Sequence, residues 1–196
     1  MAKSHGKSAG DAKRKSVRWI LCVFFSTIVI SAVISLASEE VMDNSNVWAA
    51  FLILFIIVFI GILFDIVGVA VTSATDTPFH SMAARKVPGA QESIRLLKNA
   101  ERVSSICNDV IGDICGVVSG SAAAAIAMRV TANVPRTAEN LVTLALSALV
   151  AGLTVGGKAI GKTIAISSCT KIVHTVGVIL YHCRRPFRPR QKKKNK

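Results

Sequence analysis

Four oxygen-bearing side chains lie within or beside the apolar runs of this chain. Asp65 comes late in one apolar run, and Asn108, Asp109 and Asp113 come at the start of another. An ionisable residue at membrane depth is costly and is by default a sign of function. Carboxylate and amide oxygens are hard ligands of the kind that Mg²⁺ takes, usually while it keeps several waters. These side chains therefore predict a site for a divalent cation.

The spacing of the acids adds to this prediction. Asp109 and Asp113 are four residues apart, so they share one face of a helix, where a cation could enter or leave. Asp65, late in its own run, is expected at a similar depth to Asp109. The alternative is structural: the acids are interfacial and pair with nearby basic side chains. The candidate partners are Arg85, Arg102 and Lys158.

Lys158 bears on both interpretations. A fixed cation close to a magnesium site would repel the ion by several kcal/mol at low effective dielectric. Lys158 could instead pair with Asp65 or Asp113 and close the site as a packing pair. Lys158 and Lys162 follow an apolar run, where long side chains can reach the headgroups, so both are candidates for gating positions.

The composition places the chain in the membrane class. Of its 196 residues 52% are hydrophobic, and the mean hydropathy is +0.52. The net charge of +13 is concentrated in an N-terminal arm, a central connector and the C-terminal tail. These basic segments flank apolar runs, so membrane topology and anionic lipid explain the charge better than nucleic acid does.

The apolar runs predict an all-α, polytopic membrane protein with about four transmembrane helices and further interfacial helices. The spans are expected at residues 19–37, 48–71, 106–130 and 141–157. The first run also has the general pattern of a signal peptide, although its length favours a retained helix. The basic arm, residues 1–18, has too little apolar content to fold alone.

The remaining segments determine the predicted orientation. The connector, residues 75–105, carries apolar side chains at helical spacing and is expected to lie at the membrane surface. Residues 163–182 are expected as an interfacial helix, with a fifth span as the alternative. The arm, the connector and the tail (184–196) are basic, whereas the loop at 38–46 is acidic. The positive-inside rule then puts both termini in the cytoplasm of a plasma-membrane protein.

Small residues recur every fourth position in the third apolar run. They are Gly112, Gly116, Gly120 and Ala124. Such a stripe lets two helices approach closely in lipid and predicts a helix-packing face, in the same chain or in another. No catalytic motif accompanies it: the sequence has no Gly-rich phosphate loop, HExxH or GxSxG, and its five cysteines form no CxxC pair. An enzyme is not expected.

Three stretches resemble the transmembrane domain of the CorB/CorC and cyclin-M (CNNM) magnesium transporters. Residues 63–74, LFDIVGVAVTSA, are similar to a family pattern like FFSGSETALTSA. Residues 83–112, AARKVPGAQESIRLLKNAERVSSICNDVIG, resemble the family's cytoplasmic segment and its Asn-rich GNNIVN helix start. Residues 157–165, GKAIGKTIA, resemble the pattern GEIxPKxxA. The resemblance covers residues 48–182, and the connector is its most specific part.

The resemblance implies a magnesium site between helices, in a homodimer. It aligns the family's serine with Asp65 and its glutamate with Gly68, whereas Ser73 and Asn108 are kept. In the third stretch the family's glutamate falls on Lys158. This chain has thus lost two acids of the pattern, and Asp65 and Asp113 are new. The family also has a CBS-pair module that resembles a nucleotide sensor; none is expected in this chain, so gating by nucleotide would need a separate regulatory protein.

Two functions follow as expectations. The first is transport or homeostasis of a divalent cation, Mg²⁺ or Co²⁺, with oxygen ligands from Asp65, Ser73, Asn108 and Asp113. Asp109, Lys158 and Lys162 would then control entry or gating. The second is a transport-inactive relative that acts as a membrane scaffold or partner subunit through its basic arm and tail.

Overall fold

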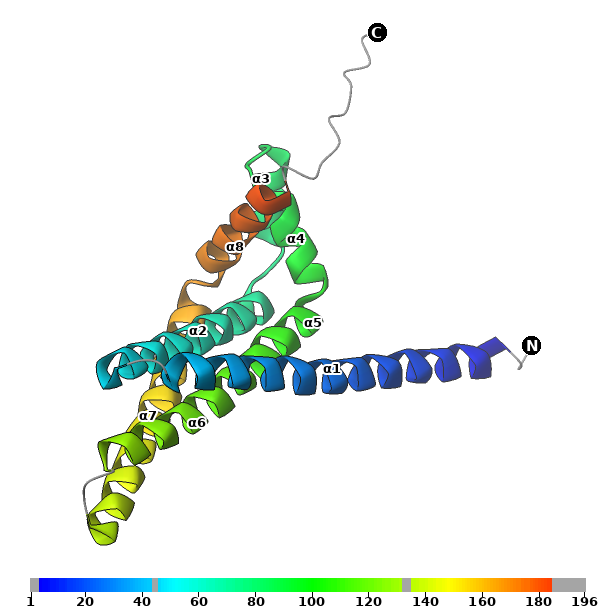
Figure 1. Ribbon diagram of the computed structural model, residues 1–196. Helices are drawn as coiled ribbons and strands as arrows, with labels where there is room; N and C mark the ends of the chain where they lie inside the picture. Colours follow the sequence, from blue (N-terminus) through cyan, green and yellow to red (C-terminus); the bar gives the residue numbers. More distant parts are fainter. Residues whose placement is uncertain (1–3, 44–45, 132–134, 185–196) are drawn as a thin grey trace. The chain divides into compact units, whose positions relative to one another are not determined.

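The computed structural model describes residues 4–43, 46–131 and 135–184, and within these ranges the chain is helical with no strand (Figure 1). Its α-helices are α1 (Ser4–Asp43), α2 (Val47–Ser73), α3 (Thr77–Ala84), α4 (Ala90–Lys98), α5 (Ala100–Ser105), α6 (Asp113–Val130), α7 (Arg136–Ser167) and α8 (Cys169–Arg184). A π-helix, η1 (Ile106–Gly112), joins α5 to α6.

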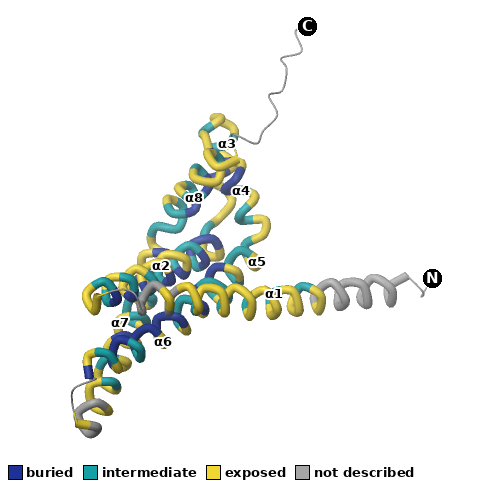
Figure 2. Tube along the Cα trace, viewed as in Figure 1, coloured by how far each residue is buried: buried dark blue, intermediate teal, exposed yellow. Residues whose placement is uncertain are grey.

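Four helices are long and apolar enough to cross a membrane. The candidate spans are Val17–Ala37, Val47–Ser73, Ala100–Val130 and Asn140–Ser167. Their side chains agree with a lipid environment, because many large apolar residues of these helices are exposed (Figure 2). The predicted all-α, polytopic class with about four spans is thereby confirmed.

Several boundaries differ from the expected ones. Helix α1 begins at Ser4 and ends at Asp43, so much of the basic arm and of the acidic loop is helical. The fourth span continues past residue 157 to Ser167 as part of α7. The chain then starts a separate helix, α8, at Cys169. The basic tail from residue 185 onward lies outside the described residues.

The chain divides into two compact units. The first comprises the described residues up to Val58 together with Asp113–Ala151. In it α1 packs against α6, whose buried residues include Ile114, Val118 and Ile126. Buried positions on α2 recur every four residues, at Ala50, Leu54 and Val58. No residue in the apolar window of α1 is buried, so most of its surface is left for lipid.

The second unit holds the connector and most of the expected site. It comprises residues 59–112 and the described residues from Gly152 onward. Its core is formed by Ala70 and Val71 of α2, Phe79 of α3, Ala165 of α7 and Val173 of α8. Glycines let α7 approach α2, because a Cβ on Gly161 would lie 2.8 Å from Ile66 Cγ1.

The connector folds into short helices with defined ends. The N–H of Lys86 donates to Ala83 O and the N–H of Val87 to Met82 O, each at 3.0 Å. These two bonds form a Schellman motif that ends α3, with Lys86 in the left-handed region at φ 57°. Pro88 follows, and Gly89 at φ 83° precedes α4. The turn between α3 and α4 is therefore specified by local hydrogen bonds.

Candidate functional site

Asp65 is a buried carboxylate on α2, within a candidate span. The residue is 4% exposed, and its Oδ2 is a buried oxygen with no hydrogen-bond partner. It forms no ion pair with Arg85, Arg102 or Lys158 in the described part of the second unit. The predicted structural pairing of this acid is therefore not found. A buried acid without a partner is unfavourable, which leaves Asp65 available to a cation.

A second buried oxygen belongs to Asn108, which lies in η1. The Nδ2 of Asn108 donates to Ser104 Oγ at 3.2 Å, whereas its Oδ1 is buried without a partner. The side chain packs directly against Gly68 of α2, where a Cβ would lie 2.8 Å from Asn108 Cγ. Gly68 is thus the residue that lets the amide reach α2.

Asp65 and Gly68 are three residues apart and share one face of α2. The carboxylate of Asp65 and the amide oxygen of Asn108 therefore lie along the same face of this helix, about one turn apart. The space beside Gly68 is filled by the side chain of Asn108, so an amide oxygen from η1 lies next to α2 at this position.

The π-helix was not predicted. A π-helix is rare, usually one turn long, and frequent at functional sites. In this chain it covers Ile106–Gly112 and carries both Asn108 and Asp109. Asp109 is exposed, and its Oδ2 accepts a hydrogen bond from Ser105 Oγ at 2.7 Å. Of the two, only Asn108 turns toward α2.

Lys158 approaches the end of this π-helix. Its Nζ lies 3.4 Å from the position that a Cβ on Gly112 would take. The ammonium of Lys158 therefore lies beside the end of η1. Its predicted pairing with Asp65 is not found among the described residues, and its charge opposes a divalent cation near η1.

Other predicted site residues are exposed, unlike Asp65. Ser73 and Lys162 are exposed. Asp113 is exposed at the first position of α6 and belongs to the first unit. At Gly116 and Gly120 an added Cβ would have no atom of its own unit within 4 Å, so the small-residue face of α6 is open within that unit.

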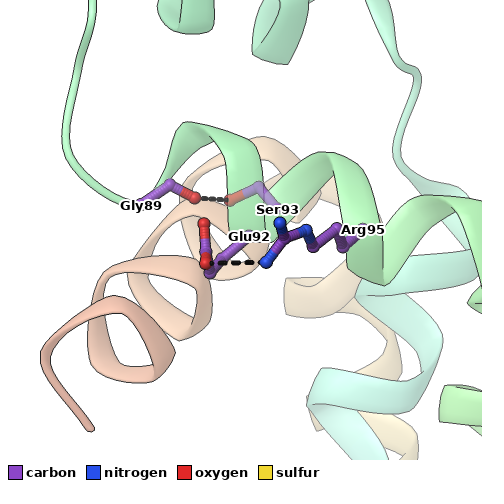
Figure 3. Close-up of polar contacts among 4 residues, drawn as sticks. All are labelled: Gly89, Glu92, Ser93 and Arg95. Carbon is purple, nitrogen blue, oxygen red and sulfur yellow. Dashed lines mark hydrogen bonds and ion pairs between the residues drawn. The ribbon is translucent and has the colours of Figure 1, made fainter. Parts of the chain in front are cut away.

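A polar contact between α4 and α8 was not predicted either, nor were the hydrogen bonds that Ser93 and Glu92 make at α4 itself (Figure 3). The Oγ of Ser93, fully buried, lies 3.0 Å from Gly89 O and 3.2 Å from Val173 O and shares its hydrogen between them. Beside it, Glu92 Oε1 accepts a hydrogen bond from Arg95 at 3.1 Å. Gly177 of α8 permits this close contact. No pattern in the sequence of α8 predicts the contact.

Among the described residues, one further buried side-chain atom has no hydrogen-bond partner, His174 Nε2 of α8. Within the described ranges, no three His, Cys, Asp or Glu side chains are grouped to hold a metal ion. Mg²⁺ is often held by one or two carboxylates while it keeps its waters, so Asp65 and Asn108 fit its coordination habits. No protein-family model, curated protein or solved structure matches this chain.

Proposed function

We propose that this chain takes part in the transport or homeostasis of a divalent cation, with Mg²⁺ as the first candidate and Co²⁺ as the second. The observation that carries the proposal is the pair of buried oxygens without partners, Asp65 Oδ2 and Asn108 Oδ1, beside one face of α2. An oxygen-lined position at membrane depth suits a hydrated hard cation. The resemblance to the CorB/CorC and cyclin-M families supports the same ion.

The proposal assigns roles to the remaining predicted residues. Asp65 and Asn108 contact the ion or its waters, and Ser73 is an accessory ligand. Asp109, Lys158 and Lys162 influence entry by their charge. The protein lies in the plasma membrane with both termini in the cytoplasm, as the basic segments favour. It acts as a homodimer, as the resemblance implies.

A second candidate function is a membrane scaffold or partner subunit that moves no ion. The position of Lys158 favours it, because an ammonium beside η1 opposes a divalent cation there. In that case water would satisfy the oxygens of Asp65 and Asn108. The two candidates differ in whether Mg²⁺ stabilises the folded protein.

Thermal unfolding in detergent, followed by circular dichroism during a Mg²⁺ titration, separates the candidates. A ligand of the folded state stabilises it by about 2.7 kcal/mol at one hundred times its Kd. We expect a saturable rise of Tm in the wild type that is lost in Asp65→Asn. Asp76→Asn is the matched control, because this acid is exposed at the start of α3. If Mg²⁺ does not raise the Tm of the wild type, or raises the Tm of Asp65→Asn equally, the scaffold function is favoured instead.

A further inference from the structure

A small cavity lies where the turn between α3 and α4 meets the end of α8, apart from Asp65 and Asn108. Its volume is about 170 Å³, and its polar lining comes from Lys86, Gln91, Glu92 and Tyr181. Sites for drug-sized ligands usually hold about 300–1,000 Å³. This cavity therefore suits a headgroup-sized molecule and excludes a nucleotide.

Glu92 supplies a buried negative charge to this cavity. Its side chain is 4% exposed, and Oε1 accepts the bond from Arg95, whose own side chain is 56% exposed (Figure 3). No donor to Oε2 is found among the described residues. Because Oε2 is not fully enclosed by the protein, a cationic or N–H group can reach it.

Lys86 supplies a positive charge at an unusual backbone position. Among the described residues it is the one non-glycine residue with positive φ, at the place in a Schellman motif that usually holds glycine. The backbone of a lysine is strained here, whereas that of a glycine would not be. Such strained residues cluster at functional sites, where the side chain contributes to the site. Lys86 and Glu92 both line the cavity, yet the described structure contains no ion pair between them.

We infer that this cavity binds a phosphate ester that also carries a primary ammonium, the chemistry of a phosphoethanolamine headgroup. Lys86 pairs with the phosphate, and Glu92 Oε2 accepts hydrogen bonds from the ammonium. Gln91 and Tyr181 are polar groups at the same wall. An anion alone would meet the carboxylate of Glu92, and a cation alone would meet Lys86. A ligand with both charges satisfies each of them.

The test is native mass spectrometry of the full chain in detergent, titrated separately with phosphatidylethanolamine, phosphatidylcholine and phosphatidylglycerol. Phosphatidylcholine has no N–H to donate, and phosphatidylglycerol has no ammonium. We expect phosphatidylethanolamine to bind at least about tenfold more tightly than either, the size of one charged hydrogen bond. Equal affinities, or tighter binding of phosphatidylglycerol, would overturn the inference.

Variants identify the residues that bind. Lys86→Gly and Glu92→Gln should each weaken phosphatidylethanolamine binding about tenfold. Lys86→Gly should at the same time raise Tm, since glycine adopts the left-handed conformation without strain, so a folding defect cannot explain the loss. Arg95→Gln is the matched control for Glu92→Gln: it breaks the same ion pair but keeps the carboxylate, and binding should persist. A lipid preference that survives in Lys86→Gly would refute the assignment.

A competition experiment with a soluble headgroup distinguishes a free headgroup from a membrane lipid as the ligand. Competition by glycerophosphoethanolamine would show that the headgroup alone is the ligand. Binding of phosphatidylethanolamine without such competition would show that the ligand is a membrane lipid held also by its acyl chains. Both results support the charge pairing at Lys86 and Glu92. Neither depends on Mg²⁺ or on Asp65, so this inference and the proposed cation site can fail separately.

Discussion

Replacement of Gly177 by alanine is expected to loosen the contact between α4 and α8. An added Cβ would lie 2.7 Å from Gly89 O and 3.1 Å from Ser93 N, and it would overlap Ser93 Oγ. Two of these are backbone atoms, and the backbone at Gly89 is itself confined, since a Cβ there would lie 2.6 Å from Val178 N. The helices must therefore separate to admit one methyl group.

Whether Gly177→Ala stabilises or destabilises the fold follows from opposing free-energy contributions. Alanine stabilises a helix interior by about 1 kcal/mol relative to glycine. Overpacking costs about 1–3 kcal/mol, and the loss of the shared Ser93 hydrogen bond costs about 1 kcal/mol. The net expectation is a destabilisation of about 1–3 kcal/mol. Gly156→Ala is the matched control, because no atom lies within 4 Å of its Cβ position, and it should be neutral or stabilising by up to about 1 kcal/mol.

Denaturant unfolding in one detergent, followed by the helical signal in circular dichroism, measures both variants. Gly177→Ala should be about 1–4 kcal/mol less stable than Gly156→Ala, as the terms above combine. The cost of Gly177→Ala should also fall in a Ser93→Ala background, since residues in contact are not additive. A Gly177→Ala protein as stable as Gly156→Ala would refute the close packing of α4 on α8.

Four further outcomes are expected. Gly68→Ala should displace the Asn108 side chain and abolish stabilisation by Mg²⁺, while the free energy of unfolding changes by no more than about 1 kcal/mol because helix propensity offsets the lost hydrogen bond. Phe79→Ala should cost about 3–5 kcal/mol, since this fully buried ring fills the core of the second unit. Gly120→Leu should lower the dimer fraction in crosslinking if the open face of α6 joins two copies. Cys183, exposed at the end of α8, should react with an impermeant maleimide only after cells are opened.

Each of these four predictions has an outcome that would contradict it. Retained Mg²⁺ stabilisation in Gly68→Ala would separate Asn108 from the cation site. Unchanged stability of Phe79→Ala would contradict the packing of α3 on that core. An undiminished dimer fraction in Gly120→Leu would move the dimer interface elsewhere. Labelling of Cys183 in intact cells would reverse the predicted orientation of the C-terminus.

Hydropathy was sufficient to predict the class of the protein. Twenty or so apolar residues in a row permit little besides a spanning helix, so the four candidate spans came directly from the sequence. The ends of the helices were harder to predict. Nothing in residues 157–168 marks where α7 stops, because Lys158 and Lys162 are compatible with a helix that continues to Ser167.

The candidate site was predicted only in part. The unusual placement of Asp65 and Asn108 in apolar runs was visible as residue type alone. The π-helix was not visible in the sequence. Its additional residue in one turn depends on how Asn108 packs against Gly68, and no residue composition is specific to a π-helix. The burial of Glu92 was not predicted. Its burial depends on α8, eighty residues away in the sequence from its neighbour Ser93.

The division into two units also separates the chromophores. Both tryptophans, Trp19 and Trp48, belong to the first unit, whereas the single tyrosine, Tyr181, belongs to the second. Selective excitation of tryptophan therefore reports on one unit alone, and tyrosine emission reports on the other. Spectroscopy on the unmodified chain can thus follow each unit by itself when ion or lipid is added.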